Sequence, residues 1–125
     1  MIDTAFHGVW RIVWMAGWDQ DFVDMEVPGH VTFEGGRSAT FQFGLVQGDM
    51  DCHPDARHPQ RVEFSWSGSD ECDEASGRGH AEIVNGELQG HLWFHNGDDS
   101  AFRAVRQGAP AKVPRKSGKS GSSPA

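Results

Sequence analysis

Acidic side chains gather in two short polar stretches of the sequence, and they are the groups best suited to bind a ligand or an ion. The members of the two stretches are Asp70, Glu71, Asp73 and Glu74, and then Asp98 and Asp99. Carboxylates that lie close together repel one another unless a cation compensates. Three outcomes are open: solvation on loops, binding of Ca²⁺ or another hard cation, or contact with a cationic ligand or basic partner. Their spacing does not fit the twelve-residue EF-hand loop, and we assign no metal ligands.

Trp18 is an aromatic residue in a polar stretch, between turn signals and beside Asp19 and Asp21. The face of an exposed indole attracts cations, so a Trp flanked by carboxylates suits a cationic or flat ligand. We therefore take Trp18, Asp19, Asp21 and Asp99 as candidate ligand-binding residues. The alternative for Trp18 is a lid that plugs one end of the fold.

Three residues are the candidates for acid–base catalysis: His95, Asp98 and Glu63. A tight turn, in which the carboxylate bonds nearby backbone N–H groups, is the alternative for Asp98. For Glu63 the alternatives are an outer-face ion pair with Arg61 or Arg78, or an inward carboxylate suited to proton transfer. Nucleophile-elbow, phosphate-loop, zinc-helix and dinucleotide signatures are absent, and we expect no cofactor.

The seven His and two Cys show no metal-ligand spacing. His91 and His95 are four residues apart on an expected strand, which separates them by about 13 Å. There is no Cys-x-x-Cys pair, and in a cytoplasmic protein Cys52 and Cys72 are expected to be free thiols.

The elements that must position these residues are strands, because apolar residues recur at every second position. The residues Trp10, Trp14 and Trp18 have helical spacing, but Val9, Ile12 and Val13 are β-branched and favour a strand. The seven predicted strands are 8–15, 29–34, 38–46, 61–67, 78–84, 88–95 and 101–106. The connection 47–60 is long enough to hold an eighth.

Turn chemistry supports this division. Asn85-Gly86 is a strong hairpin signal because both residues tolerate positive φ. Asp19 is placed to cap a short helical turn that ends before Pro28. Gly68 and Gly77 are interpreted as the two ends of a polar loop.

Short links between most strands predict an all-β fold, a compact antiparallel up-and-down barrel of seven or eight strands. With seven strands, the loops 68–77 and 96–100 share one end with the Gly35-Gly36 turn. The loops 16–28 and 47–60 then lie at the opposite end. An eighth strand within 47–60 would change this assignment.

The charge is divided unevenly between a body, 6–107, and a C-terminal segment, 108–125. All 18 Asp and Glu but only seven Arg precede residue 108, a formal charge of −11, whereas the last 18 residues carry four Lys and Arg. Such an acidic body repels phosphate backbones, so we expect no nucleic-acid partner. The last segment is rich in Gly, Pro and Ser and is predicted to be a disordered basic tail. No stretch resembles a membrane span or a signal peptide, which predicts a cytoplasmic protein and leaves the oligomeric state open.

Two resemblances complete this picture. Gly8-Val9-Trp10, with Arg103 or Arg106 near the end of the body, resembles the pattern of calycin (lipocalin-like) barrels. That resemblance implies that Gly-x-Trp opens the first strand and that the late Arg packs across the Trp. Residues 8–106 also resemble a group of small uncharacterised bacterial proteins, a resemblance that implies no activity. The similar segments are 18–22, 62–66, 76–79 and 95–100.

These observations favour a non-enzymatic barrel that binds a small aromatic or cationic ligand at an acidic, Trp-lined mouth. An interior filled completely by side chains would argue against that function. One alternative is an acidic interaction module, of inhibitor or immunity type, that covers a basic partner. The other is a small hydrolase or isomerase that uses the three catalytic candidates named above.

Overall fold

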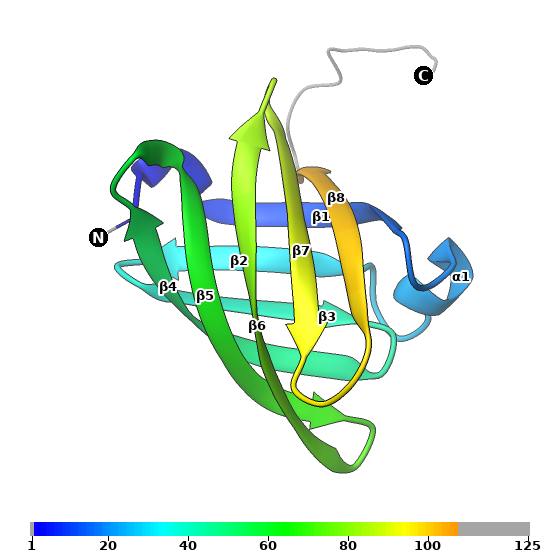
Figure 1. Ribbon diagram of the computed structural model, residues 1–125. Coiled ribbons are helices and arrows are strands. Elements are labelled where there is room, and N and C mark those ends of the chain that lie inside the picture. The colour runs from blue at the N-terminus through cyan, green and yellow to red at the C-terminus, as the bar shows by residue number, and fades with distance from the viewer. Residues whose placement is uncertain (1, 108–125) are drawn as a thin grey trace, which may run out of the picture.

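The structure is a computed structural model that describes residues 2–107 (Figure 1). Within this range, eight strands are accompanied by a 3-10 turn, η1 (Thr4–Phe6), and a one-turn helix, α1 (Gln20–Val23). Neither helical segment is long and apolar enough to cross a membrane. The strands are β1 (Gly8–Met15), β2 (His30–Gly35), β3 (Ser38–Phe43), β4 (Val46–Asp55), β5 (His58–Asp70), β6 (Asp73–Val84), β7 (Glu87–Phe94) and β8 (Asp99–Arg106).

The strands form a closed barrel in chain order, and every neighbouring pair is antiparallel. The sheet closes where β8 pairs with β1, in a register that places Arg106 opposite Trp10 and Phe102 opposite Met15. A register shift between Ile12 and Trp14 interrupts that pairing. The prediction of an all-β, up-and-down barrel is therefore confirmed, and so is the choice of a strand at 8–15.

The connection 47–60 does contain an eighth strand, β4. Its buried positions alternate with exposed ones, and the inward residues are Val46, Gly48, Met50 and Cys52. A glycine and a cysteine in two of the four inward positions weaken the apolar rhythm, which explains why 47–60 also fitted a loop. The predicted strand 38–46 in fact ends at Phe43, and the tight turn Gly44-Leu45 separates it from β4.

Gly68 and Gly77 do not bracket a loop, contrary to the prediction. They lie inside β5 and β6, whose ladder continues to Asp70 opposite Asp73 and leaves only Glu71 and Cys72 in the turn. A Cβ atom at Gly77 would lie 1.8 Å from the carbonyl oxygen of Trp93, so the glycine is needed for close approach of the strands. This hairpin projects beyond the barrel wall (Figure 1), so both faces of its tip are in contact with water. The residues there are mostly polar, as this exposure requires.

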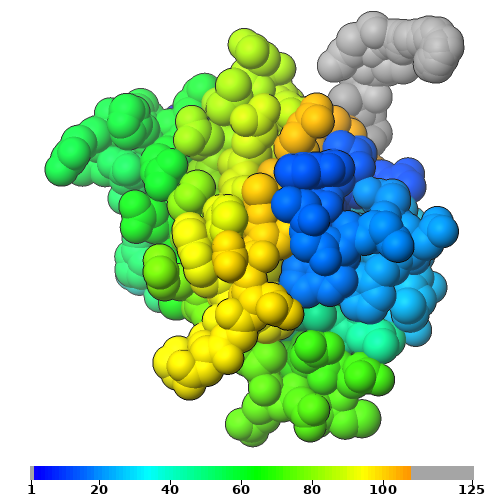
Figure 2. All heavy atoms as spheres, turned by 45° about the vertical axis from the view of Figure 1, so that its right-hand side comes forward, coloured from blue at the N-terminus to red at the C-terminus, as the bar shows by residue number. Residues whose placement is uncertain are grey.

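Because there are eight strands, one part of the predicted grouping of the connections is correct and another is wrong. The β5–β6 and β7–β8 turns do share an end, as predicted. The acidic turn at 71–72 does not share an end with the Gly35-Gly36 turn. It lies instead at the end that holds the Trp18 connection, as Figure 1 shows along the chain and Figure 2 shows on the surface. We call this the acidic end of the barrel, and its four connections are 16–29, 44–45, 71–72 and 95–98.

The interior of the barrel is filled by side chains. Its largest fully buried members include Trp10, Phe33, Phe43 and Leu88. Among the described residues, nine apolar side chains surround an interior void of only about 20 Å³, which is room for about one water molecule. No small organic ligand fits inside this closed sheet.

The end opposite the acidic end is sealed by the N-terminal residues. Ile2 and Phe6 are buried there, so packing begins before residue 6, the predicted start of the domain. The Cζ atom of Arg106 lies 4.2 Å from the ring centroid of Trp10, and the guanidinium donates hydrogen bonds to the carbonyl oxygens of Ala5 and His7. Of the two arginines named from the sequence, Arg106 is therefore the one that packs across Trp10. The predicted tail, 108–125, lies outside the described residues.

Candidate functional site: an acidic pocket over an aromatic floor

A pocket of about 270 Å³ opens at the acidic end, and it joins residues from three connections of the barrel. We call it the mouth pocket. Trp18 and Phe94 contribute aromatic surface to it, and four carboxylates stand around them. The lining residues are Trp18, Asp70, Asp73, Glu74, Ala75, Ser76, Phe94, His95, Gly97 and Asp98.

Trp18 is half-buried because the segment that carries it is fastened to the barrel. The buried hydroxyl of Ser100 accepts a hydrogen bond from the N–H of Gly17 at 2.9 Å and donates one to the carbonyl oxygen of Ala101. On the other side, Asp19 caps α1 by accepting from the N–H of Phe22, as the sequence predicts. These contacts hold the indole across the end of the barrel.

The indole of Trp18 rests on other aromatic rings and forms the floor of the site. Its ring centroid lies 5.0 Å from that of Phe43, 6.0 Å from that of Phe94 and 6.2 Å from that of Phe22. Phe94 in turn meets Trp66 edge to face at 5.1 Å. Trp18 thus closes the end of the barrel, and its indole also lines the mouth pocket.

The carboxylates of the mouth pocket come from the β5–β6 hairpin and from the β7–β8 turn. Asp70 and Asp73 face each other at the end of the hairpin ladder, Glu74 follows, and Asp98 approaches from the other turn. Within residues 2–107, these four groups have no ion-pair partner within 4.0 Å. Glu71, which was predicted with them, lies in the turn and does not line the pocket.

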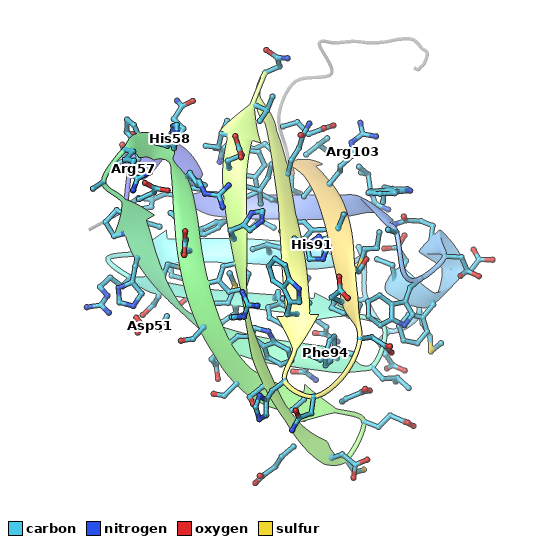
Figure 3. The ribbon with its side chains drawn as sticks, in the orientation of Figure 1. Asp51, Arg57, His58, His91, Phe94 and Arg103 are labelled. Carbon is cyan, nitrogen blue, oxygen red and sulfur yellow. The ribbon has the colours of Figure 1, made fainter. Side chains whose placement is uncertain are left out.

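The other predicted ligand-binding residues are not at the pocket. Asp19 uses its carboxylate as the helix cap, and Asp21 is exposed in the first turn of α1. Asp99 lies on β8, where its Oδ2 atom is 2.5 Å from Nε2 of His91 on the outer wall (Figure 3). His80 lies beside His91, and burial is the main cause that lowers the pKa of His80 below its usual value.

The catalytic candidates are not assembled into one site. His95 and Asp98 both line the mouth pocket, but the described structure has no hydrogen bond or ion pair between them. Glu63 is exposed on β5, directly opposite His80 on β6. The backbone N–H of His95 donates a hydrogen bond to the carbonyl oxygen of Ser76, which lies four residues from His80 along β6. Four residues of a strand span about 13 Å. Glu63 is therefore not the inward carboxylate that was considered, and it pairs with neither Arg61 nor Arg78.

Several residues of the site were not singled out from the sequence, notably Phe94, Ala75 and Ser76. Phe94 is the last residue of β7 and belongs to a clear apolar alternation, so it was counted as core. Figure 3 shows that it lies where β7 ends, beside the turn that leads to β8. A residue at the last position of an inward-facing series lines the opening of a barrel, and this position was the available signal.

The described residues hold no group of three or more His, Cys, Asp or Glu arranged to bind a metal ion. The two cysteines are free, and burial is the main cause that raises the pKa of Cys52 to about 12. Comparison with known protein families and with curated proteins finds no match for this chain. The geometry of the mouth pocket is therefore the feature that bears on function.

Proposed function

We propose that the protein is a non-enzymatic binding protein whose mouth pocket receives a small organic cation. The observation that carries this proposal is the joint lining of one pocket by Trp18, Phe94 and four carboxylates that lack a cationic partner among residues 2–107. Aromatic faces and carboxylates both attract cations, so their preferences coincide here.

The size and position of the pocket limit the ligand. A volume of about 270 Å³ at the barrel end accepts a small amine or quaternary ammonium ion, whereas the filled interior accepts neither. The filled interior is the result that was expected to argue against a ligand-binding barrel, so the proposal is limited to the pocket at the barrel end and includes no binding inside the sheet. The position of Glu63 favours binding over catalysis, because this residue lies far from His95 and Asp98 along the wall.

Isothermal titration with choline and with hexylamine tests this function. We expect saturable binding that Asp73→Asn weakens about two- to fivefold, since an exposed charge pair contributes little by itself. The triple change Asp73→Asn, Glu74→Gln, Asp98→Asn should remove most of the binding. Glu34→Gln is the matched control, because Glu34 is exposed on β2, away from the pocket. Equal weakening by the control, or no binding of either cation, would reject the proposal.

A second candidate function is supported by the shape of the β5–β6 hairpin. Its acidic tip projects beyond the barrel wall, where a basic protein surface can reach Glu71 as well as the pocket carboxylates (Figure 1). We propose this acidic interaction module as the alternative. Binding of a basic protein that weakens steeply with added salt, and that Glu71→Gln weakens while choline binding is unchanged, would favour it over the small-ligand function.

We also propose that the protein is a calycin-like member of a small bacterial family and acts in the cytoplasm. The contact between Arg106 and Trp10 supports the first part, because it is the contact that the Gly-x-Trp resemblance implies. Solving the structures of bacterial proteins similar in sequence, and asking whether they form the same barrel with the mouth carboxylates retained, would test this membership.

A further inference from the structure

A second hollow lies on the outer wall beside the mouth pocket, over β5, β6 and β7. It encloses about 620 Å³, and Ser76, Phe94 and His95 border both hollows. We call it the outer groove. In contrast to the mouth pocket, no carboxylate lines it, and its remaining residues are Ser65, Trp66, Gly77, Arg78, Trp93 and Asn96. The two adjoining hollows therefore differ sharply in charge.

Arg78 is the cation of the outer groove, and its side chain has a defined place. Its Cζ atom lies 4.5 Å from the ring centroid of Trp93. That indole is itself held in position, because the ring of His91 packs at 4.3 Å and the backbone carbonyl of Trp93 accepts a hydrogen bond from Trp66. The guanidinium of Arg78 therefore stacks on an indole ring whose own position is fixed by its neighbours.

The hydrogen-bonding capacity of Arg78 is not used by the described residues. Four other arginines form ion pairs with carboxylates, and the guanidinium of Arg106 bonds backbone carbonyls. Within residues 2–107, the guanidiniums of Arg78 and Arg57 have no ion pair within 4.0 Å. Guanidinium N–H groups bind carboxylate or phosphate in a forked geometry, and Ser65, directly opposite Arg78 in the ladder, adds a hydroxyl donor.

A free anion is nevertheless a poor ligand for this protein. Residues 1–107 carry a formal charge of −11, which repels anions at long range. An anionic group that arrives together with a cation avoids this repulsion, because the whole ligand is neutral and each end meets its own hollow. Ser76, Phe94 and His95 form the border that the two hollows share.

We propose that the ligand of the mouth pocket is zwitterionic, with its ammonium group among the carboxylates and its carboxylate or phosphate group on Arg78 in the outer groove. This inference rests on the proposed cation-binding function and adds the chemical class of the ligand. Arg78 is then a specificity residue, since it distinguishes a zwitterion from the plain amine of the same skeleton.

Matched pairs of probes test the inference by isothermal titration. Hexylamine is compared with 6-aminohexanoate, and butyltrimethylammonium with 4-(trimethylammonio)butanoate, so that each pair differs in the anionic group and the second member of each pair is neutral overall. In at least one pair, the member with the anionic group should bind about tenfold tighter, as a charge-assisted, forked contact predicts. Arg78→Gln should remove that advantage and leave the affinity for the plain amine unchanged, which also shows that the variant is folded.

Arg57→Gln is the control, because among residues 2–107 the guanidinium of Arg57 also forms no ion pair and no hydrogen bond, and Arg57 lies in the β4–β5 turn at the far end of the barrel (Figure 3). The inference is overturned if neither pair shows the advantage, if the advantage survives Arg78→Gln, or if Arg57→Gln removes it equally. Plain amines that bind without an advantage for the zwitterion reject this inference alone. Failure of every probe to bind rejects the cation-binding function with it.

Discussion

The two cysteines differ in environment, and their reactivity reports on the packing of β4. Cys52 is buried, with a pKa raised to about 12, whereas Cys72 is exposed in the β5–β6 turn. Because the thiolate is the reactive form, we expect a thiol reagent at pH 8 to modify one cysteine in the folded protein and two in urea. Rapid modification of both cysteines without denaturant would contradict the placement of Cys52 inside the barrel.

The side chain of Arg106 should contribute to stability through its contacts with Trp10 and two carbonyl groups. We expect Arg106→Gln to lower the free energy of unfolding by about 2 kcal/mol, since both a cation–π contact and hydrogen bonds to partly buried carbonyls are lost. Arg103→Gln, which removes the ion pair between exposed Arg103 and Glu87, should have a clearly smaller effect than Arg106→Gln. Urea denaturation measures both values, and a larger effect of Arg103→Gln would argue against this account of the barrel end.

At the residue scale, the sequence allowed most carboxylates of the site to be selected, but it did not reveal which partner each carboxylate contacts. Of the six acidic residues in the two polar stretches, all but Glu71 and Asp99 do line the pocket, together with Trp18. Asp19 and Asp99 are equally acidic and lie close in sequence to pocket residues, but one caps a helix and the other bonds a histidine. Such local partners depend on backbone direction and register, which side-chain type does not reveal.

At the scale of the elements, the glycines of β5 and β6 provide a test of the long hairpin. Gly77→Ala places a Cβ atom 1.8 Å from the carbonyl oxygen of Trp93, so the strands must separate. We expect a loss of about 2 kcal/mol or more in the free energy of unfolding. Gly36→Asn is the control, because nothing lies within 4 Å of a Cβ there and Asn tolerates the positive φ of 60°. A Gly77→Ala protein as stable as the control would indicate a loop at 68–77.

Strands with a regular apolar face were predictable, whereas strands without one were not. β1 was placed with its observed bounds, and the Asn85-Gly86 hairpin was correct, because β-branching and turn chemistry act locally. β4 and the tips of β5 and β6 were uncertain or missed. β4 has glycine at one of its inward positions. The tips of β5 and β6 extend past the barrel wall, where neither face is buried, so apolar residues no longer recur at every second position.

At the scale of the whole molecule, the number of strands decides which residues meet. An eighth strand reverses the direction of every later strand, and this moves the acidic hairpin from the far end of the barrel to the end that carries Trp18. The fold class was predictable from pattern and link length. The meeting of the two acidic turns was also predictable, but the position of Trp18 beside them was not, because a single uncertain strand in 47–60 determines which connections share an end.

The most direct test of the central claim is a two-dimensional ¹H–¹⁵N NMR titration of the protein with choline. The account predicts that shifted amides cluster at the acidic end, near residues 17–18, 70–76 and 94–98, and that the Trp18 indole N–H shifts with them. Amides in the turns at 36–37, 56–57 and 85–86, at the opposite end, should not move. Shifts centred on that opposite end, or no shift at any residue at saturating choline, would contradict the assignment of the mouth pocket as a cation-binding site.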